Sequence, residues 1–222
     1  VQFMYADMPV SLSGSYTKTH VALKTALGSS KAEDGYYSQA FQNFIDYIPV
    51  IVGRVQDQYA GATYPSTGFM RDNPHAGMPF DPQVGGVSET SSDVLIPAFI
   101  AAYTGSNPTK QYLDPFPSFA HVLPNWRVTY DGLINLGNMR KYLKSFTLSH
   151  AYQCTYSVGS YSSYLNWLSA GDNIGFTLDE LTGSPIPSSP YNISSVSITE
   201  RFAPLIGFNA TPVSYTHLTL PT

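Results

Sequence analysis

Charge is scarce in this chain of 222 residues, because Asp, Glu, Lys and Arg together make up only 12% of it. Typical soluble domains carry about 25%. The formal net charge is -4, and no basic stripe is present to meet phosphates, so we expect no nucleic-acid partner. The local basic cluster of Arg140, Lys141 and Lys144 is typical of the solvated start of a strand.

The chain has a single cysteine, Cys154, which excludes an intrachain disulfide framework. No stretch approaches the roughly 18 consecutive apolar residues of a transmembrane helix. Nucleophile-elbow, phosphate-loop and HExxH motifs are missing. Metal-ligand spacing is also missing among the four histidines before residue 213, which are His20, His75, His121 and His150. We therefore expect no enzyme activity, no cofactor and no metal. A secreted glycan hydrolase would need two converging carboxylates, which no pattern here indicates.

The clearest pattern present is a period of two from Lys144 to Val158. Large apolar and aromatic side chains occupy the even positions, and small polar ones occupy most odd positions. Such alternation predicts a β-strand between two unlike environments. A strand that spans a membrane barrel needs about 9–11 residues, so this strand is long enough. His150 and Cys154 lie on its apolar face, where we expect a hydrogen-bonded structural histidine and a packed thiol.

Tyrosine is abundant, with 17 copies, while hydrophobic residues make up 43% of the chain. Low charge together with many Tyr, Ser, Thr and Gly residues is typical of an outer-membrane β-barrel. A secreted β-sandwich can share this composition. Composition alone therefore leaves both fold classes open.

Three further segments alternate and predict strands: Val10–His20, Asn125–Gly132 and Ser195–Thr211. Pro204 interrupts the last of these, so we expect a β-bulge or a bend there.

Two segments have a helical rather than a strand-like pattern. Residues 38–58 place apolar side chains at intervals of three and four, and Pro49 is expected to kink or split this helix. Residues 92–105 predict a short apolar helix that ends at Gly105. Its first turn offers several capping side chains, namely Ser91, Ser92 and Asp93. Tyr59–Glu89 has no period and predicts a long loop.

The last ten residues, 213–222, read VSYTHLTLPT. This string matches a transposase-type sequencing adapter translated in frame. We expect it not to be native protein and exclude it from fold reasoning. We also expect residues 1–212 to be a fragment of a longer chain.

Four strings, in matching order and spacing, resemble the SprA/Sov family, the outer-membrane translocon of the type IX secretion system. They are DVLIPAFIAAYTG at 93–105, PNWRVTYDGL at 124–133, SFTLSHAYQCTYSVGSY at 145–161 and ITERFAPLIGFNAT at 198–211. The resemblance covers roughly residues 90–211 and is weaker before them. Ala151 stands where the family is expected to have Gly. This difference affects how closely the strand packs, not the resemblance to the family.

The resemblance implies a mainly β fold: long antiparallel strands of a very large transmembrane β-barrel, of about 36 strands, with short helical inserts in long loops. It implies the outer membrane of a Gram-negative bacterium of the Bacteroidota, at the cell surface. It also implies a role in protein transport, and in gliding motility in some relatives. The expected partners are the rest of the barrel, folded cargo with C-terminal secretion signals, other type IX subunits and outer-membrane lipid. No catalytic residue is implied.

The family motifs mark a set of expected structural residues. They are Pro124, Asn125, Trp126, Arg127, Tyr130, Leu148, His150, Tyr152, Tyr156, Pro204 and Gly207. A second set, Leu95, Phe99 and Tyr103, is expected to pack the short helix on the barrel wall or rim, where it would shape the pore mouth or a partner's docking site. The plainer alternative is a helix that only packs its own loop.

The alternation also predicts which way each face points. Phe146, Leu148, Tyr152 and Tyr156 are expected to face lipid or a neighbouring protein wall, with Trp126 toward the interfacial aromatic girdle. Ser145, Thr147, Ser149 and Gln153 are expected to face a wet lumen. The alternatives are a secreted carbohydrate-binding β-sandwich and a porin-like transporter barrel.

Overall fold

The computed structural model describes residues 39–116, 124–179 and 181–213 in full. Before residue 39 it describes only the backbone of five strands, which are β1 Met4–Asp7, β2 Val10–Thr17, β3 His20–Lys24, β4 Ser29–Ala32 and β5 Gly35–Ser38. The strand predicted over 10–20 is therefore shorter than expected, because β2 ends at Thr17 and His20 opens β3. The facing of its side chains lies outside the described residues, and so does the predicted adapter segment apart from Val213.

The chain forms two compact units, each made of several stretches. The first unit contains residues 1–12, 123–155 and 199–222, and the second contains residues 13–122 and 156–198.

The first unit is built on four strands with fully described side chains. These are β6 Trp126–Tyr130, β7 Leu143–Val158, β13 Ser195–Phe202 and β14 Gly207–Pro212, and both β7 and β13 extend into the second unit. Two short helical turns, η3 Gly132–Asn135 and η4 Met139–Lys141, connect β6 to β7. The expected long strand is confirmed, since β7 has 16 residues.

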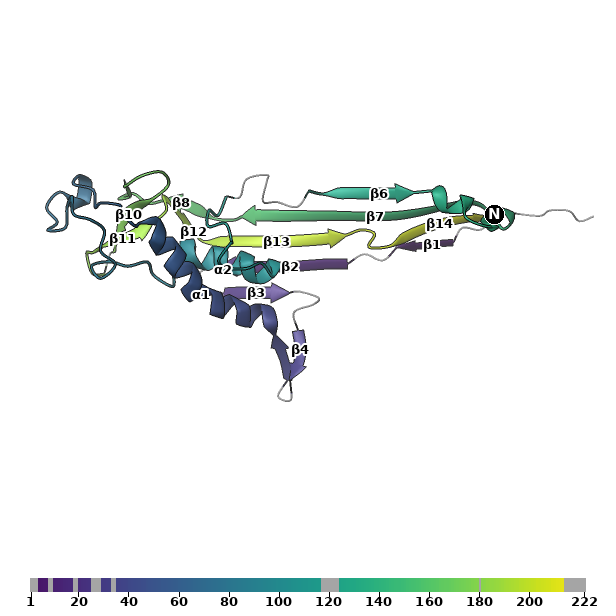
Figure 1. The fold of residues 1–222 in the computed structure, drawn as a ribbon, viewed down its shortest axis with the longest axis horizontal. Coiled ribbons are helices and arrows are strands. Elements are labelled where there is room, and N and C mark those ends of the chain that lie inside the picture. The colour runs from purple at the N-terminus through teal and green to yellow at the C-terminus, as the bar shows by residue number, and fades with distance from the viewer. Residues whose placement is uncertain are drawn as a thin grey trace, which may run out of the picture. The chain divides into compact units, whose positions relative to one another are not determined.

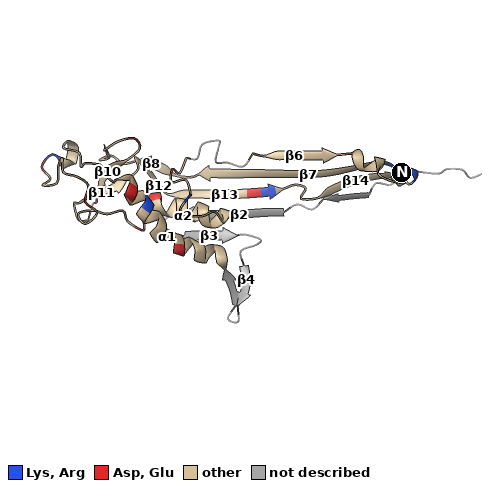
Figure 2. Ribbon diagram, viewed as in Figure 1, with Lys and Arg blue, Asp and Glu red and all other residues tan. Residues whose placement is uncertain are grey.

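The strands form a sheet with the order β1-β14-β7-β13-β2-β3, and β6 pairs with β7 off this path (Figure 1). The registers of β6, β14 and β1 are all antiparallel. Over the described residues this sheet is open, with β1 and β3 at its ends. The expected mainly β, antiparallel class with two helices is thus confirmed. Figure 2 shows that charged residues are sparse along the long strands.

The second unit holds both helices and three small sheets. Its helices are α1 Gln39–Gln58 and α2 Ser92–Thr104, which pack on each other. The short strands are β8 Tyr161–Ser163, β9 Leu168–Ser169, β10 Gly175–Leu178, β11 Pro185–Ser188 and β12 Tyr191–Ile193. β10 pairs with β9 and β11, β12 pairs with β8, and β4 pairs with β5.

Pro49 does not split α1, which runs unbroken through it. A proline inside a helix frees the carbonyl of the residue four positions earlier, here Ile45. Both Pro49 and Ile45 are exposed, so water can bind that carbonyl. Of the two expected effects of Pro49, a split of the helix was therefore wrong, and a kink stays a prediction.

Helix α2 is apolar on all sides and almost entirely buried, as expected for a helix at the centre of a small core. Its N-cap is Ser91, which makes no side-chain capping bond. Gly105 ends the helix in the left-handed region with φ 68°, which confirms the predicted stop. Over the described residues, no helix combines the length and apolar character that crossing a membrane requires.

The aperiodic segment 59–89 contains one short helical turn, η1 Gly68–Met70, and supplies most of a buried aromatic cluster. The ring of Phe176 on β10 lies 4.8 Å from Tyr64, 5.4 Å from Tyr59 and 5.8 Å from Phe80, centroid to centroid. Phe176 and Tyr64 are almost wholly buried. This predicted loop is therefore held by aromatic packing rather than by regular backbone structure.

Candidate functional site

The central feature of the first unit is an aromatic face shared by three adjacent strands. Trp126 on β6 is registered with Tyr152 on β7, and their rings stack at 4.3 Å. Phe202 on β13 packs on the other side of Tyr152 at 5.0 Å. Cross-strand aromatic pairs of this kind stabilise a sheet, and here they join motif residues that lie far apart in the sequence.

Polar groups on this aromatic face are hydrogen-bonded. The Tyr152 hydroxyl donates to Glu200 Oε1 at 2.5 Å. His150 Nδ1 lies 2.7 Å from the Leu205 carbonyl oxygen, so this nitrogen carries the proton. The hydrogen bond expected for His150 is thus present, and it satisfies a polar ring that is half-buried in the sheet.

The expected irregularity at Pro204 is confirmed as a bulge opposite β7. Ala151 N donates to Pro204 O and Ala203 N donates to Ala151 O, while Gly207 is registered with Ser149. From Ala151 to Ser149 β7 advances two residues, whereas the opposite strand advances four, from Ala203 to Gly207. Two extra residues are thus accommodated between β13 and β14.

Gly207 is required at the end of this bulge by close packing. A Cβ atom at this position would lie 2.6 Å from Ser149 Oγ and 2.7 Å from Pro204 Cγ. A Cβ here would therefore force Ser149 and the rigid Pro204 ring to shift, so glycine favours the close approach of β14 to β7.

The remaining motif residues are placed nearby but form no single cluster. Asn125 accepts a hydrogen bond from Cys154 N at 2.7 Å through its side-chain oxygen. Tyr130 and Leu148 are registered with each other, and Pro124 is exposed. Tyr156 belongs to the second unit, where its hydroxyl donates to Pro115 O at 2.9 Å.

The two faces of β7 differ as the alternation predicted, most clearly from residue 152 onward. Tyr152 is buried, while Gln153, Thr155 and Ser157 are exposed. Around residue 148 both faces are half-buried. Which of these faces meets lipid or a lumen stays a prediction.

Of the three residues predicted to form a docking helix, Phe99 and Tyr103 are buried, and their rings lie 6.3 Å apart. Leu95 is half-buried. They contribute to the packing of α2 within the second unit, and a role in docking a partner stays a prediction.

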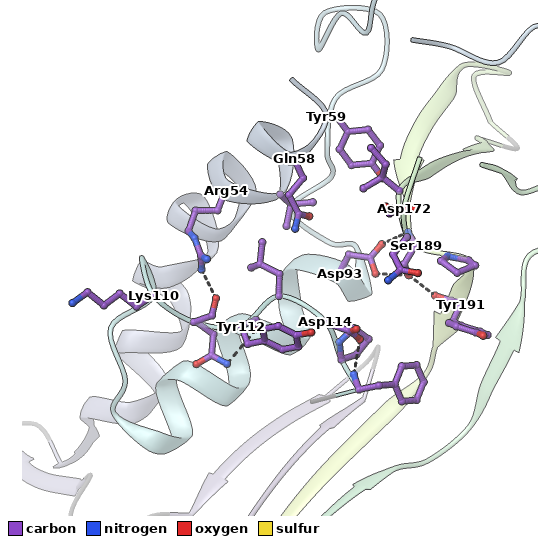
Figure 3. A pocket seen from close by; sticks show the side chains of 18 residues that line it. Arg54, Gln58, Tyr59, Asp93, Lys110, Tyr112, Asp114, Asp172, Ser189 and Tyr191 are labelled. Carbon is purple, nitrogen blue, oxygen red and sulfur yellow. Dashed lines mark hydrogen bonds between the residues drawn. The ribbon is translucent and has the colours of Figure 1, made fainter. Parts of the chain in front are cut away.

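The second unit contains a pocket of about 460 Å³ that the sequence did not indicate (Figure 3). It is lined from α1, the start of α2 and the loops around residues 110–116, 172–174 and 189–191. Arg54 Nη1 donates to Pro108 O at 2.7 Å and to Gln111 O at 2.6 Å, so this arginine ties the pocket's outer loop to α1.

Asp93 is the most deeply placed carboxylate of this pocket. It accepts hydrogen bonds from Ser189 N at 2.9 Å and from Ser189 Oγ at 2.6 Å. Burial raises the pKa of Asp93, and the two bonds from Ser189 oppose that rise. Sequence analysis assigned Asp93 only a capping role, because Ser189 lies 96 residues away.

Tyr59 forms the wall between the pocket and the aromatic cluster. Its hydroxyl donates to two carbonyl oxygens, Gly175 O at 3.0 Å and Ser188 O at 3.3 Å. Burial raises the pKa of Tyr59 to about 12, so the phenol stays neutral and serves as a hydrogen-bond donor at physiological pH.

The pocket is lined by both apolar and polar side chains. It presents Tyr112, Tyr191 and the carboxylates of Asp114 and Asp172. Among the residues that the structure describes, no group of three His, Cys, Asp or Glu side chains could hold a metal ion. No family model matches this chain, and no curated protein shows significant similarity to it.

Proposed function

We propose that this chain is part of the wall of an outer-membrane protein-conducting translocon of the type IX secretion kind. The observation that carries the proposal is the two-faced sheet around β7. Its 16 residues exceed the span of a membrane strand, one face is aromatic, and the other is small and polar. A barrel wall needs this pattern, with an apolar outside and a polar inside.

Exposure on the aromatic face supports the same proposal. Trp126, Val128 and Tyr130 on β6 are 39%, 54% and 51% exposed, although they share a face with Tyr152 and Leu148. Contiguous apolar surface of this kind is uncommon in soluble monomers and marks a site that lipid or protein covers.

The hydrogen-bonded polar pair on this face favours protein as the covering layer near Tyr152. A carboxylate in lipid is costly even when it is paired, and Glu200 lies beside Tyr152 on the aromatic face. We assign the part of the aromatic face around Glu200 to a contact with a neighbouring protein wall. The part around Leu148 and Phe146 is assigned to lipid.

Three of the four family strings contain most or all of β6, β7, β13 and β14, four of the seven strands of this sheet, which supports the assignment by resemblance. In that role the chain would supply a few strands and loops of a much larger pore. The pore would pass folded cargo with C-terminal signals, with other type IX subunits as partners.

The test is made in the full-length parent protein, recovered by extending the gene in both directions. Leu148→Arg should impair assembly into the outer membrane, with a cost of about 2–4 kcal/mol if the site is near the bilayer midplane. Thr147→Arg, its neighbour on the other face, should be tolerated. The readout is the amount of folded, heat-modifiable protein in the outer-membrane fraction. Equal tolerance of the two variants, or a parent gene of ordinary enzyme length, would refute the proposal.

A second candidate, a secreted carbohydrate-binding module, is favoured by one observation. The pocket of the second unit combines exposed tyrosine rings with carboxylates, which together can stack on and hydrogen-bond a sugar. This candidate predicts that residues 1–212 express as a soluble monomer that unfolds cooperatively. The translocon proposal predicts that the isolated chain needs detergent.

A further inference from the structure

The polar face of the same sheet carries two arginines on either side of β7. Arg127 on β6 is registered with Ala151 on β7. Arg201 on β13 follows Glu200, whose carboxylate lies on the aromatic face, so alternation places Arg201 on the polar face. Both arginines line one groove of about 440 Å³, together with Gln153 and Ala151.

The geometry brings the two guanidinium groups within reach of one ligand. Arg127 lies opposite Ala151, and the bond from Ala203 N to Ala151 O places Arg201 two residues further along, opposite Gln153. With strands about 4.8 Å apart and a rise of about 3.4 Å per residue, the two arginine backbones are separated by roughly 12 Å. On β7, Ala151 beside Arg127 ends in a methyl group and Gln153 beside Arg201 is polar and uncharged, so no charged side chain stands between the two arginines in the groove. Two long side chains can therefore converge over β7.

Neither arginine has an acidic partner among the residues that the structure describes. Both are exposed, and the neighbours that line the groove are neutral: Asn125, Trp126, Ala151, Tyr152, Gln153 and Ala203. Like charges on one sheet face repel each other. An anion placed between them would remove that repulsion and gain charge-assisted hydrogen bonds.

We propose that this groove binds a carboxylate group of a polypeptide, held between Arg127 and Arg201. Guanidinium presents a planar fork of donors that matches the two oxygens of a carboxylate. Phosphate sites usually add free backbone N–H groups. Here the N–H groups of Ala151 and Cys154 are already bonded, to Pro204 O and to the Asn125 side chain. The proposal does not depend on the translocon assignment.

The test measures binding of a fluorescein-labelled polyglutamate peptide to the full 222-residue chain by anisotropy, at constant ionic strength. Binding should be saturable. Arg127→Gln or Arg201→Gln should weaken it by about tenfold or more, because each removes charge-assisted hydrogen bonds. The matched control is Arg71→Gln, which removes the same charge from an exposed site in the other unit and should leave binding unchanged.

Three outcomes would overturn the proposal. One is an Arg127→Gln/Arg201→Gln chain that binds as tightly as the unmodified chain. Another is full affinity in an Arg127→Lys/Arg201→Lys chain, which would show attraction by charge alone. The third is displacement of the peptide by inorganic phosphate at lower concentration than by succinate, which would assign the groove to phosphate. Unchanged near-ultraviolet circular dichroism confirms that each variant is folded.

Discussion

Tyr59→Phe isolates the contribution of one buried hydroxyl, because the ring that packs on Phe176 is kept. The hydroxyl ties the end of α1 to β10 and β11 through Gly175 and Ser188. A neutral hydrogen bond contributes about 0.5–1.5 kcal/mol, and leaving a buried partner unsatisfied costs about 1–3 kcal/mol. We therefore expect the free energy of unfolding of the second unit to fall by about 1–3 kcal/mol at pH 7.

The pH dependence of the same variant provides an independent check. The pKa of Tyr59 rises from 10.0 to about 12 on folding, so its stabilising contribution is complete below pH 10 and is lost as the pH rises toward 12. At pH 11 the loss is about 1.4 kcal/mol, because this pH is one unit above the unfolded pKa and one unit below the folded pKa. The difference between the unmodified chain and Tyr59→Phe should therefore shrink from pH 9 to pH 11.

The assay is urea unfolding of the full chain in detergent micelles. It follows the fluorescence of Trp167, whose indole nitrogen donates to Ser188 O at 2.9 Å. Trp126→Phe in all variants removes the signal of the first unit. Tyr47→Phe on α1 is the control, since its hydroxyl has no hydrogen bond to the described residues, and it should change stability by less than about 0.5 kcal/mol. Equal effects of the two substitutions at pH 7, or a difference that stays constant up to pH 11, would refute the argument.

Two further predictions concern single buried contacts. The raised pKa of Asp93 makes its charged form costly in the folded chain, so stability should decline as the pH rises above the ordinary pKa of 3.8. Asp93→Asn should remove this decline, because its amide cannot ionise but can still accept from Ser189 N and donate to Ser189 Oγ. Urea unfolding at pH 4 and pH 7 should therefore give closer values for the variant than for the unmodified chain. Gly207→Ala should destabilise the first unit by about 1–3 kcal/mol through overpacking against Pro204. Gly53→Ala inside α1 should instead stabilise the second unit by about 0.5–1 kcal/mol, because a Cβ there meets nothing within 4 Å. Thermal unfolding in which both variants change stability in the same direction would contradict this.

The regular elements could be predicted because their signal is local. β7 repeats every two residues and α2 is a continuous apolar run that ends at Gly105, so short windows of sequence define both. Whether Pro49 splits α1 could not be predicted, because this effect depends on the exposure of the Ile45 carbonyl, which no local pattern reveals.

The pocket of the second unit could not be predicted, because its parts come from aperiodic segments that meet only in the folded chain. Asp93 is hydrogen-bonded to Ser189, and Tyr59 is hydrogen-bonded to Gly175, which lies 116 positions later in the chain. Hydrogen bonds of this kind join a side chain to a distant backbone and leave no periodic trace. The abundance of tyrosine was the only signal available, since buried tyrosines require such partners.

The bulge between β13 and β14 explains how one sheet keeps two chemically distinct faces along its length. A shift of one residue would turn every following side chain to the opposite face. The bulge inserts two residues, an even number, so Phe202 before it and Phe208 after it remain on the face of Tyr152 and Leu148. Because an even insertion preserves this parity, the chain can bend at Pro204 without moving aromatic side chains to the polar face. The division between the two faces, on which both the wall and the arginine groove depend, is thus maintained through the irregular segment.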